Sequence, residues 1–238
     1  MRGGHGGGWT GSAHVRDGRW YDDAMKVRVA CVHATPRAMA AAAAMLAERP
    51  GLEHKDILEP ALLEYGELGQ RGREFFRKAL VQAAVLEPEL ILTTCSMYTQ
   101  YLPALREELS RPVLGIDEPM IELAAERGGR LALVGSIRNA IEFTGRLVRE
   151  RAEALGRSVR IDHALLVPRN AGEQGPEADD AAARITRLAA EVDTVLIVQL
   201  SLSGLRVRLE RQDVRARTFT SAETAMQRLD EMLGQQQG

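Results

Sequence analysis

Cys95 is the residue whose type and position best suit chemistry. It follows the apolar run at residues 90–93, in the segment Thr93-Thr94-Cys95-Ser96, and precedes a segment of helical periodicity. Open α/β sheets bind ligands beyond the carboxyl ends of their strands, and a helix N-terminus lowers the pKa of a nearby thiol because it stabilises the thiolate. Thr94 and Ser96 add hydroxyl donors for a carboxylate. The alternative is that Cys95 is a small buried hydrophobic residue.

Three other residues of the first half lie near a comparable strand end. Cys31 stands within the apolar run at residues 29–32, so we expect it to fill the core. His33 and Thr35 follow this run, where polar side chains can reach the same edge of a sheet as Cys95. His33 could bind a carboxylate or tune the thiolate, and a hydrogen-bonded structural histidine is the alternative.

Polar residues also end two strand-like runs of the second half. Ser136 follows the run at residues 131–134 and precedes a helical segment. This predicts a second anion-binding site at a helix start, called here the anion seat, with a plain N-cap as the alternative. Gln199 ends the run at residues 195–198, and Ser201 follows two residues later.

Sequence patterns and composition exclude several classes of function. No G-x-G-x-x-G or G-x-x-x-x-G-K-[ST] pattern follows a strand-like run, the histidines are scattered, and neither cysteine belongs to a C-x-x-C pair. We therefore expect no nucleotide cofactor and no metal. A net charge of −2 and 4% aromatic residues argue against a nucleic-acid partner. No apolar run approaches the roughly 18 residues of a membrane span, and two cysteines without a signal peptide predict a cytoplasmic protein.

The elements that must position these residues alternate along the chain. From Lys26 onward, short apolar runs alternate with helical stretches, which predicts βαβ units and an α/β fold with mainly parallel sheets. The segment from Glu89 to Cys95 has the same length and pattern as that from Asp193 to Gln199. This indicates two similar lobes, although any two buried parallel strands after an acidic helix end look alike. Residues 1–24 are glycine-rich and without periodicity, so we expect a disordered leader.

Five segments together resemble the aspartate/glutamate racemase superfamily, a cofactor-independent group that includes hydantoin racemases, maleate isomerases and arylmalonate decarboxylases. They are VACVHATP at 29–36, ELILTTCSM at 89–97, RPVLGIDEPM at 111–120, RLALVGSIRNAIEF at 130–143 and VDTVLIVQLSLSGL at 192–205. The resemblance implies two flavodoxin-like parallel-sheet lobes related by a pseudo-twofold axis. A small amino acid or other carboxylate would bind in the cleft between them.

The same resemblance implies how the chain divides. The N-terminal lobe would comprise residues 25–116 with 222–238, and the C-terminal lobe residues 117–221, because the family's chain returns to its first lobe. Asp117 would then lie at the lobe junction, although a helix start before Pro119 also explains it. We also expect a homo-oligomer, namely a dimer.

One position departs from the two-base members of this family, which place one cysteine from each lobe on opposite faces of the substrate carbon. Cys95 matches the first cysteine, whereas the second position holds Gln199, an amide that does not titrate. The resemblance favours an isomerase with Cys95 as thiolate base or nucleophile. The predicted ligand-binding residues are Thr35, Thr94, Ser96, Ser136 and Gln199.

Three readings of the departure stay open. Cys95 alone could catalyse isomerisation, decarboxylation or elimination. A racemase could instead use Ser201, His33 or a water molecule as its second proton relay. The third reading is a protein that binds a small carboxylate without catalysis.

Overall fold

The computed structural model describes residues 13–16, 19–22, 28–65, 69–210, 214 and 217–235. Within the expected leader, strands β1 (Ala13–Arg16) and β2 (Arg19–Asp22) pair antiparallel. The expectation of a disordered leader at residues 1–24 stays a prediction. The rest of residues 1–27 lies outside the described residues.

The first of two parallel sheets is built from the first half of the chain. Its strands are β3 (Val29–His33), β4 (His54–Leu58), β5 (Leu90–Thr93) and β6 (Val113–Gly115), in the order β4-β3-β5-β6. Every residue of β3 and β5 is buried, as expected for parallel strands covered on both faces. The edge strand β4 is the more exposed one, which fits its polar sequence.

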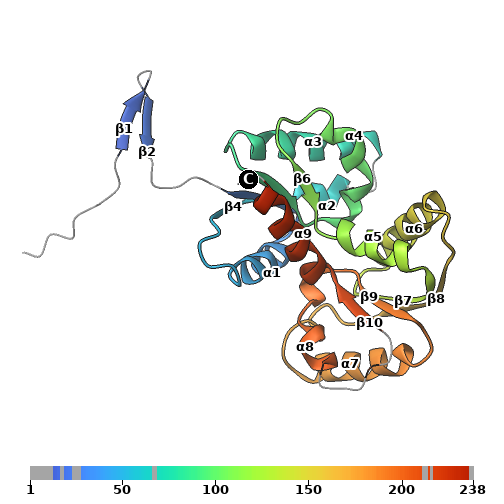
Figure 1. The fold of residues 1–238 in the computed structure, drawn as a ribbon. Coiled ribbons are helices and arrows are strands. Elements are labelled where there is room, and N and C mark those ends of the chain that lie inside the picture. Colours follow the sequence, from blue (N-terminus) through green and yellow to red (C-terminus); the bar gives the residue numbers. More distant parts are fainter. Residues whose placement is uncertain are drawn as a thin grey trace, which may run out of the picture.

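The second sheet repeats this arrangement. Its strands are β7 (Gly129–Gly135), β8 (Val159–Leu166), β9 (Thr194–Ile197) and β10 (Arg217–Thr220), in the order β10-β9-β7-β8. Numbered from its own first strand, each sheet has the order 2-1-3-4, which is the start of the flavodoxin-like order. The predicted α/β fold with two flavodoxin-like lobes is confirmed (Figure 1).

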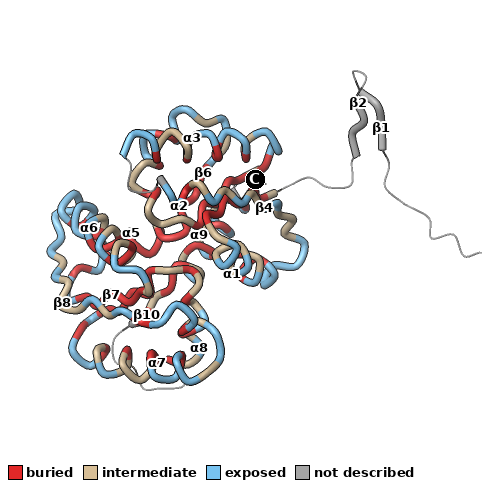
Figure 2. Tube along the Cα trace, turned by 180° about the vertical axis from the view of Figure 1, so that it is seen from behind, coloured by how far each residue is buried: buried red, intermediate tan, exposed pale blue. Residues whose placement is uncertain are grey.

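Helices cover both faces of each sheet, and the buried residues lie between the layers (Figure 2). The first sheet lies between α1 (Pro36–Leu46) on one face and α3 (Gln70–Ala84) with α4 (Leu102–Arg106) on the other. The second lies between α7 (Pro176–Ala189) with α8 (Leu205–Leu209), and α5 (Glu118–Arg127) with α6 (Arg138–Ala154). The shorter elements are α2 (Ala61–Tyr65) and the 3-10 helices η1 (Ser96–Tyr101) and η2 (Leu200–Leu202).

The last helix, α9 (Ser221–Gln235), follows a strand of the second sheet but packs on the first. Its residues Ala225, Leu229 and Leu233 share a buried cluster with Val29 and Leu114 of the first sheet. Figure 1 shows α9 beside α1 and α5, at the junction of the two sheets. The predicted lobe boundaries, residues 25–116 with 222–238 and residues 117–221, stay a proposal.

The segment after β5 differs from the single helix that its periodicity at residues 99–109 predicts. Pro103 lacks the N–H that would bond to the carbonyl of Thr99, so a continuous α-helix cannot form there. The chain instead forms η1 and then α4. None of the described helices is long and apolar enough to cross a membrane.

Candidate active site

A cavity of about 470 Å³ lies where the carboxyl ends of the two sheets meet. Residues following β3, β5, β7 and β9 line it, because the carboxyl ends of parallel strands share one edge of a sheet. The structure brings most of the sequence-predicted residues into this wall: Thr35, Thr94, Cys95, Ser96, Ser136, Gln199 and Ser201. Of the predicted site residues, only His33 does not line the cavity.

Cys95 stands between β5 and η1, in an extended backbone conformation. Burial raises the pKa of its thiol to about 12, and nearby Asp117 adds to the rise, although the Met97 N–H opposes it. The predicted lowering of this pKa is therefore wrong. The physical reason is that η1 is a short 3-10 helix supplying one bonded N–H, which does not offset the loss of water around the sulfur.

The second cysteine, Cys31, is fully buried inside β3, as expected of a core residue. Burial and the charge of Asp56 raise the pKa of its thiol. Its sulfur, His33 and Asp56 form a compact group, but the imidazole of His33 is already bonded on both sides.

His33 lies behind the cavity wall and acts on it through Thr94. Its side chain is fully buried, with Nε2 2.8 Å from Asp56 Oδ1 and Nδ1 2.9 Å from Thr94 Oγ1. Burial lowers the pKa of His33, which favours the neutral ring. Since a carboxylate only accepts, Nε2 carries the proton and Nδ1 accepts the Thr94 hydroxyl. His33 thus positions Thr94, whose oxygen then offers lone pairs to the cavity.

Gln199 closes the anion seat that was predicted at Ser136. Its Oε1 accepts the Ser136 N–H, the Ser136 hydroxyl at 3.1 Å and the Ile137 N–H at 3.2 Å. Ile137 is the N-cap of α6 and has no side-chain oxygen of its own, so the glutamine oxygen supplies the missing acceptor. Gly135 permits this approach, because a Cβ there would lie 3.2 Å from Oε1 and 2.8 Å from Ile141.

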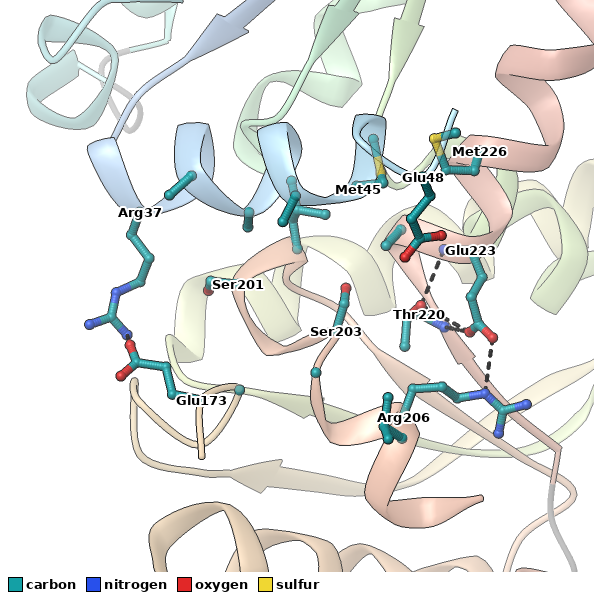
Figure 3. Close-up of a pocket in the computed structure, with 18 of the residues that line it drawn as sticks. Arg37, Met45, Glu48, Glu173, Ser201, Ser203, Arg206, Thr220, Glu223 and Met226 are labelled. Carbon is teal, nitrogen blue, oxygen red and sulfur yellow. Dashed lines mark hydrogen bonds and ion pairs between the residues drawn. The ribbon is translucent and has the colours of Figure 1, made fainter. Parts of the chain in front are cut away.

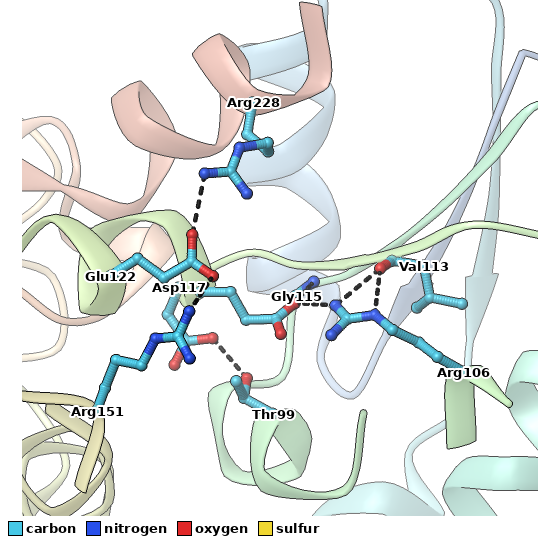
Figure 4. Close-up of polar contacts among 9 residues, drawn as sticks. Thr99, Arg106, Val113, Gly115, Asp117, Glu122, Arg151 and Arg228 are labelled. Atoms are coloured by element: carbon cyan, nitrogen blue, oxygen red, sulfur yellow. Dashed lines mark hydrogen bonds and ion pairs between the residues drawn. The ribbon is translucent and has the colours of Figure 1, made fainter. Parts of the chain in front are cut away.

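Asp117 is a buried acid beneath η1 that sequence reasoning did not assign to the site. Its Oδ1 accepts the Thr99 hydroxyl at 2.5 Å, whereas its buried Oδ2 has no hydrogen-bond partner (Figure 4). Burial raises its pKa to about 7, although hydrogen bonds from Thr99 and Ser96 oppose the rise. An acid before Glu118-Pro119 signals only a helix start in the sequence, and its burial depends on the distant segment η1.

The mouth of the cavity joins the two lobes through Arg37 at the start of α1. Its Nη1 donates to the backbone oxygen of Arg169 at 2.6 Å and pairs with Glu173 at 3.3 Å (Figure 3). The loop at residues 167–175 also packs backbone to backbone against η2, since a Cβ at Gly172 would overlap the backbone oxygen of Ser201. The loop is therefore closely fitted to the cavity wall.

A larger cavity, of about 840 Å³, lies on the other side of this mouth, between α1, α8 and α9 (Figure 3). It shares Arg37, Leu200 and Ser201 with the smaller one. Its charged lining is largely engaged in ion pairs, such as Arg49 with Asp230 and Arg206 with Glu223. Of these two cavities, Cys95 lines only the smaller one.

Comparison with known proteins relates the whole arrangement to one family. Residues 33–228 match the family model described as Asp/Glu/Hydantoin racemase. No curated protein matches the sequence.

Solved structures share the fold at low sequence identity. Allantoin racemase from Klebsiella pneumoniae is 16% identical, with a TM-score of 0.63 over 88% of this chain and 89% of that one. Glutamate racemase from Bacillus anthracis is 16% identical, with a TM-score of 0.62 over 88% and 82%. A cysteine-to-serine variant of maleate cis-trans isomerase from Nocardia farcinica, with a covalently bound succinylcysteine intermediate, is 20% identical, with a TM-score of 0.59 over 87% and 92%.

Proposed function

The chain belongs to the Asp/Glu/Hydantoin racemase family, and from this premise we propose that it is a cofactor-independent isomerase acting at the α-carbon of a small amino or dicarboxylic acid. Cys95 is the proposed acid–base or nucleophilic group. The observation that carries the proposal is the position of Cys95 in the wall of an interlobe cavity that also contains Thr35, Thr94 and Ser96. The predicted dimer and cytoplasmic location stay predictions.

In the proposed isomerisation, the thiolate of Cys95 removes the α-proton. The proton forms the S–H bond, and the electron pair of the broken C–H bond moves into the substrate carboxylate as an enediolate. The Thr35 hydroxyl, whose oxygen accepts the Ala38 N–H and whose proton is therefore available to a ligand, stabilises the developing charge on this carboxylate. Because the pKa of Cys95 is raised to about 12, the thiolate is a strong base but scarce at neutral pH, so the rate should increase as the pH rises.

The return of a proton from the opposite face is the difficult step for this chain. Gln199, on the side of the second lobe, does not titrate, and His33 does not line the cavity. Ser201 does line it, so Ser201 or a water molecule is the proposed second relay. Proton exchange on one face should accordingly be faster than inversion.

A second candidate function is decarboxylation with Cys95 as the only acid. The raised pKa favours it, because Cys95 is then a neutral thiol at neutral pH and can donate a proton directly. Loss of carbon dioxide leaves its bonding electron pair on the α-carbon, the thiol protonates that carbon, and the resulting thiolate regains a proton from solvent. This route needs no second titrating group, so it is consistent with Gln199 at the position where two-base members have their second cysteine.

Proton NMR in D2O, with a panel of small amino and dicarboxylic acids, separates these functions. Exchange of the α-proton without inversion indicates a one-base isomerase, exchange with inversion a racemase, and loss of substrate with a new deuterated product a decarboxylase. Cys95→Ala should abolish the reaction, whereas the matched variant Cys31→Ala should retain it. If no acid of the panel exchanges or is consumed, the proposed catalysis is wrong and simple carboxylate binding is the remaining reading.

A further inference from the structure

The start of α6 has the donors that commonly hold an anion. The N–H groups of Ser136 and Ile137 and the Ser136 hydroxyl converge on one point, and the dipole of a long helix favours negative charge there. That point is occupied by Oε1 of Gln199. A ligand carboxylate therefore cannot use these donors while the glutamine stays in place.

The orientation of the Gln199 amide follows from chemistry. An amide nitrogen cannot accept the N–H groups of Ser136 and Ile137, so the oxygen must face the helix. The NH2 group is the other branch of the planar amide, so its two N–H donors remain for a ligand. Since Gln199 belongs to the wall of the Cys95 cavity, this end of the wall presents neutral N–H donors in place of a charged helix terminus.

The charges around the cavity are not symmetric. Arg37, which pairs with Glu173, and Arg169 line its mouth, and the described lining residues include neither aspartate nor glutamate. The Thr35 oxygen accepts the Ala38 N–H at 3.0 Å, which leaves its own hydroxyl proton for a ligand. The first lobe and the mouth of the cavity can thus bind one carboxylate of a ligand. No aspartate or glutamate among the described lining residues is present to pair with an α-ammonium group.

We propose that Gln199 determines specificity by replacing an anion seat with a carbonyl-binding amide. Among the acids of the proposed function, this narrows the substrate to a small dicarboxylic acid whose second carboxyl group is a neutral amide, and it excludes acids with an ammonium group. A second carboxylate would give up its hydrating water and receive only neutral N–H donors, which do not balance its charge. A neutral carbonyl oxygen needs only one amide N–H as its partner. This inference rests on the proposed function, because it describes the ligand of the same cavity.

Calorimetric binding of three probes tests the inference: succinate, its monoamide succinamate, and aspartate. Wild-type protein should bind succinamate about 10-fold or more tightly than succinate, and aspartate most weakly. Gln199→Ala frees the donors at the start of α6. The affinity for succinate should therefore increase and the affinity for succinamate should decrease, each by about 10-fold. Gln199→Glu still accepts the Ser136 and Ile137 N–H groups but has no donors, so it should weaken both ligands.

Two controls separate this inference from the proposed function. Gln227→Ala removes an exposed glutamine of α9 and should leave the ranking unchanged. Repeating the titrations in Cys95→Ala removes the chemistry, and an unchanged ranking there supports the inference even if no reaction is found. Amide NMR signals of Ser136 and Ile137 should shift upfield in Gln199→Ala, which reports the lost hydrogen bonds without any ligand. The inference is overturned if wild type and Gln199→Ala rank succinate and succinamate alike, or if neither binds any probe.

Discussion

Replacing Asp117 with asparagine should reduce the pH dependence of the protein's stability. Burial raises the pKa of Asp117 from 3.8 to about 7, so the folded protein holds this proton more tightly than the unfolded chain does. The stabilisation by the neutral acid is fully present below about pH 4 and is lost as the pH rises through about 7. At about 1.4 kcal/mol per pH unit, the difference amounts to about 4 kcal/mol.

Asp117→Asn keeps an oxygen that can accept the Thr99 hydroxyl and carries no charge at any pH. The free energy of unfolding should therefore exceed that of wild type by less than about 1 kcal/mol near pH 4 and by about 4 kcal/mol near pH 8. Urea-induced unfolding, followed by circular dichroism across this pH range, measures the gap. Asp180→Asn removes an exposed acid of α7 and should show no comparable trend. A gap between Asp117→Asn and wild type that stays constant with pH would refute the reasoning.

Three further predictions concern the cavity. Iodoacetamide should label Cys95 increasingly as the pH rises toward about 12, but Cys31 only after unfolding; equal labelling would show that burial does not control reactivity. Gln199→Cys supplies the missing second thiol and should raise racemisation of a small 2-substituted carboxylic acid without an ammonium group by about 10²- to 10⁴-fold in polarimetry, and an unchanged rate would place the second relay elsewhere. Gly172→Ala forces its loop away from Ser201, so it should lower the melting temperature and weaken ligand binding, whereas an unaltered melting curve would contradict the close packing.

The strand ends could be predicted from sequence because β3, β5, β7 and β9 are nearly continuous apolar runs. Polar residues that follow such runs must meet at one edge of a parallel sheet, which is why Cys95 and Gln199 were found. His33 fits the second of its two sequence readings, a hydrogen-bonded structural histidine, because it is the last residue of β3 and not part of the following loop. Its side chain is therefore held against the sheet by the hydrogen bond to Asp56 on the neighbouring strand β4.

Other properties of the site depend on contacts between distant segments. The bond between Gln199 and Ser136 joins residues 63 positions apart, and neither residue alone signals it. The raised pKa values of Cys95 and Asp117 arise from dehydration by the surrounding layers, which local sequence does not encode. Sequence therefore predicted which residues line the cavity better than it predicted the protonation of buried groups.

The return of α9 to the first sheet has a consequence for vectorial synthesis on the ribosome. One face of the first sheet, with Val29 and Leu114, is buried by Ala225 and Leu229 of a helix that is translated after the whole second sheet. The nascent first lobe must therefore keep part of an apolar face uncovered while nearly half of the chain, from β6 to α9, is still being made. Chains released before α9 is synthesised should be recognised by chaperones or aggregate through that face, even though all the strands of the first sheet are present.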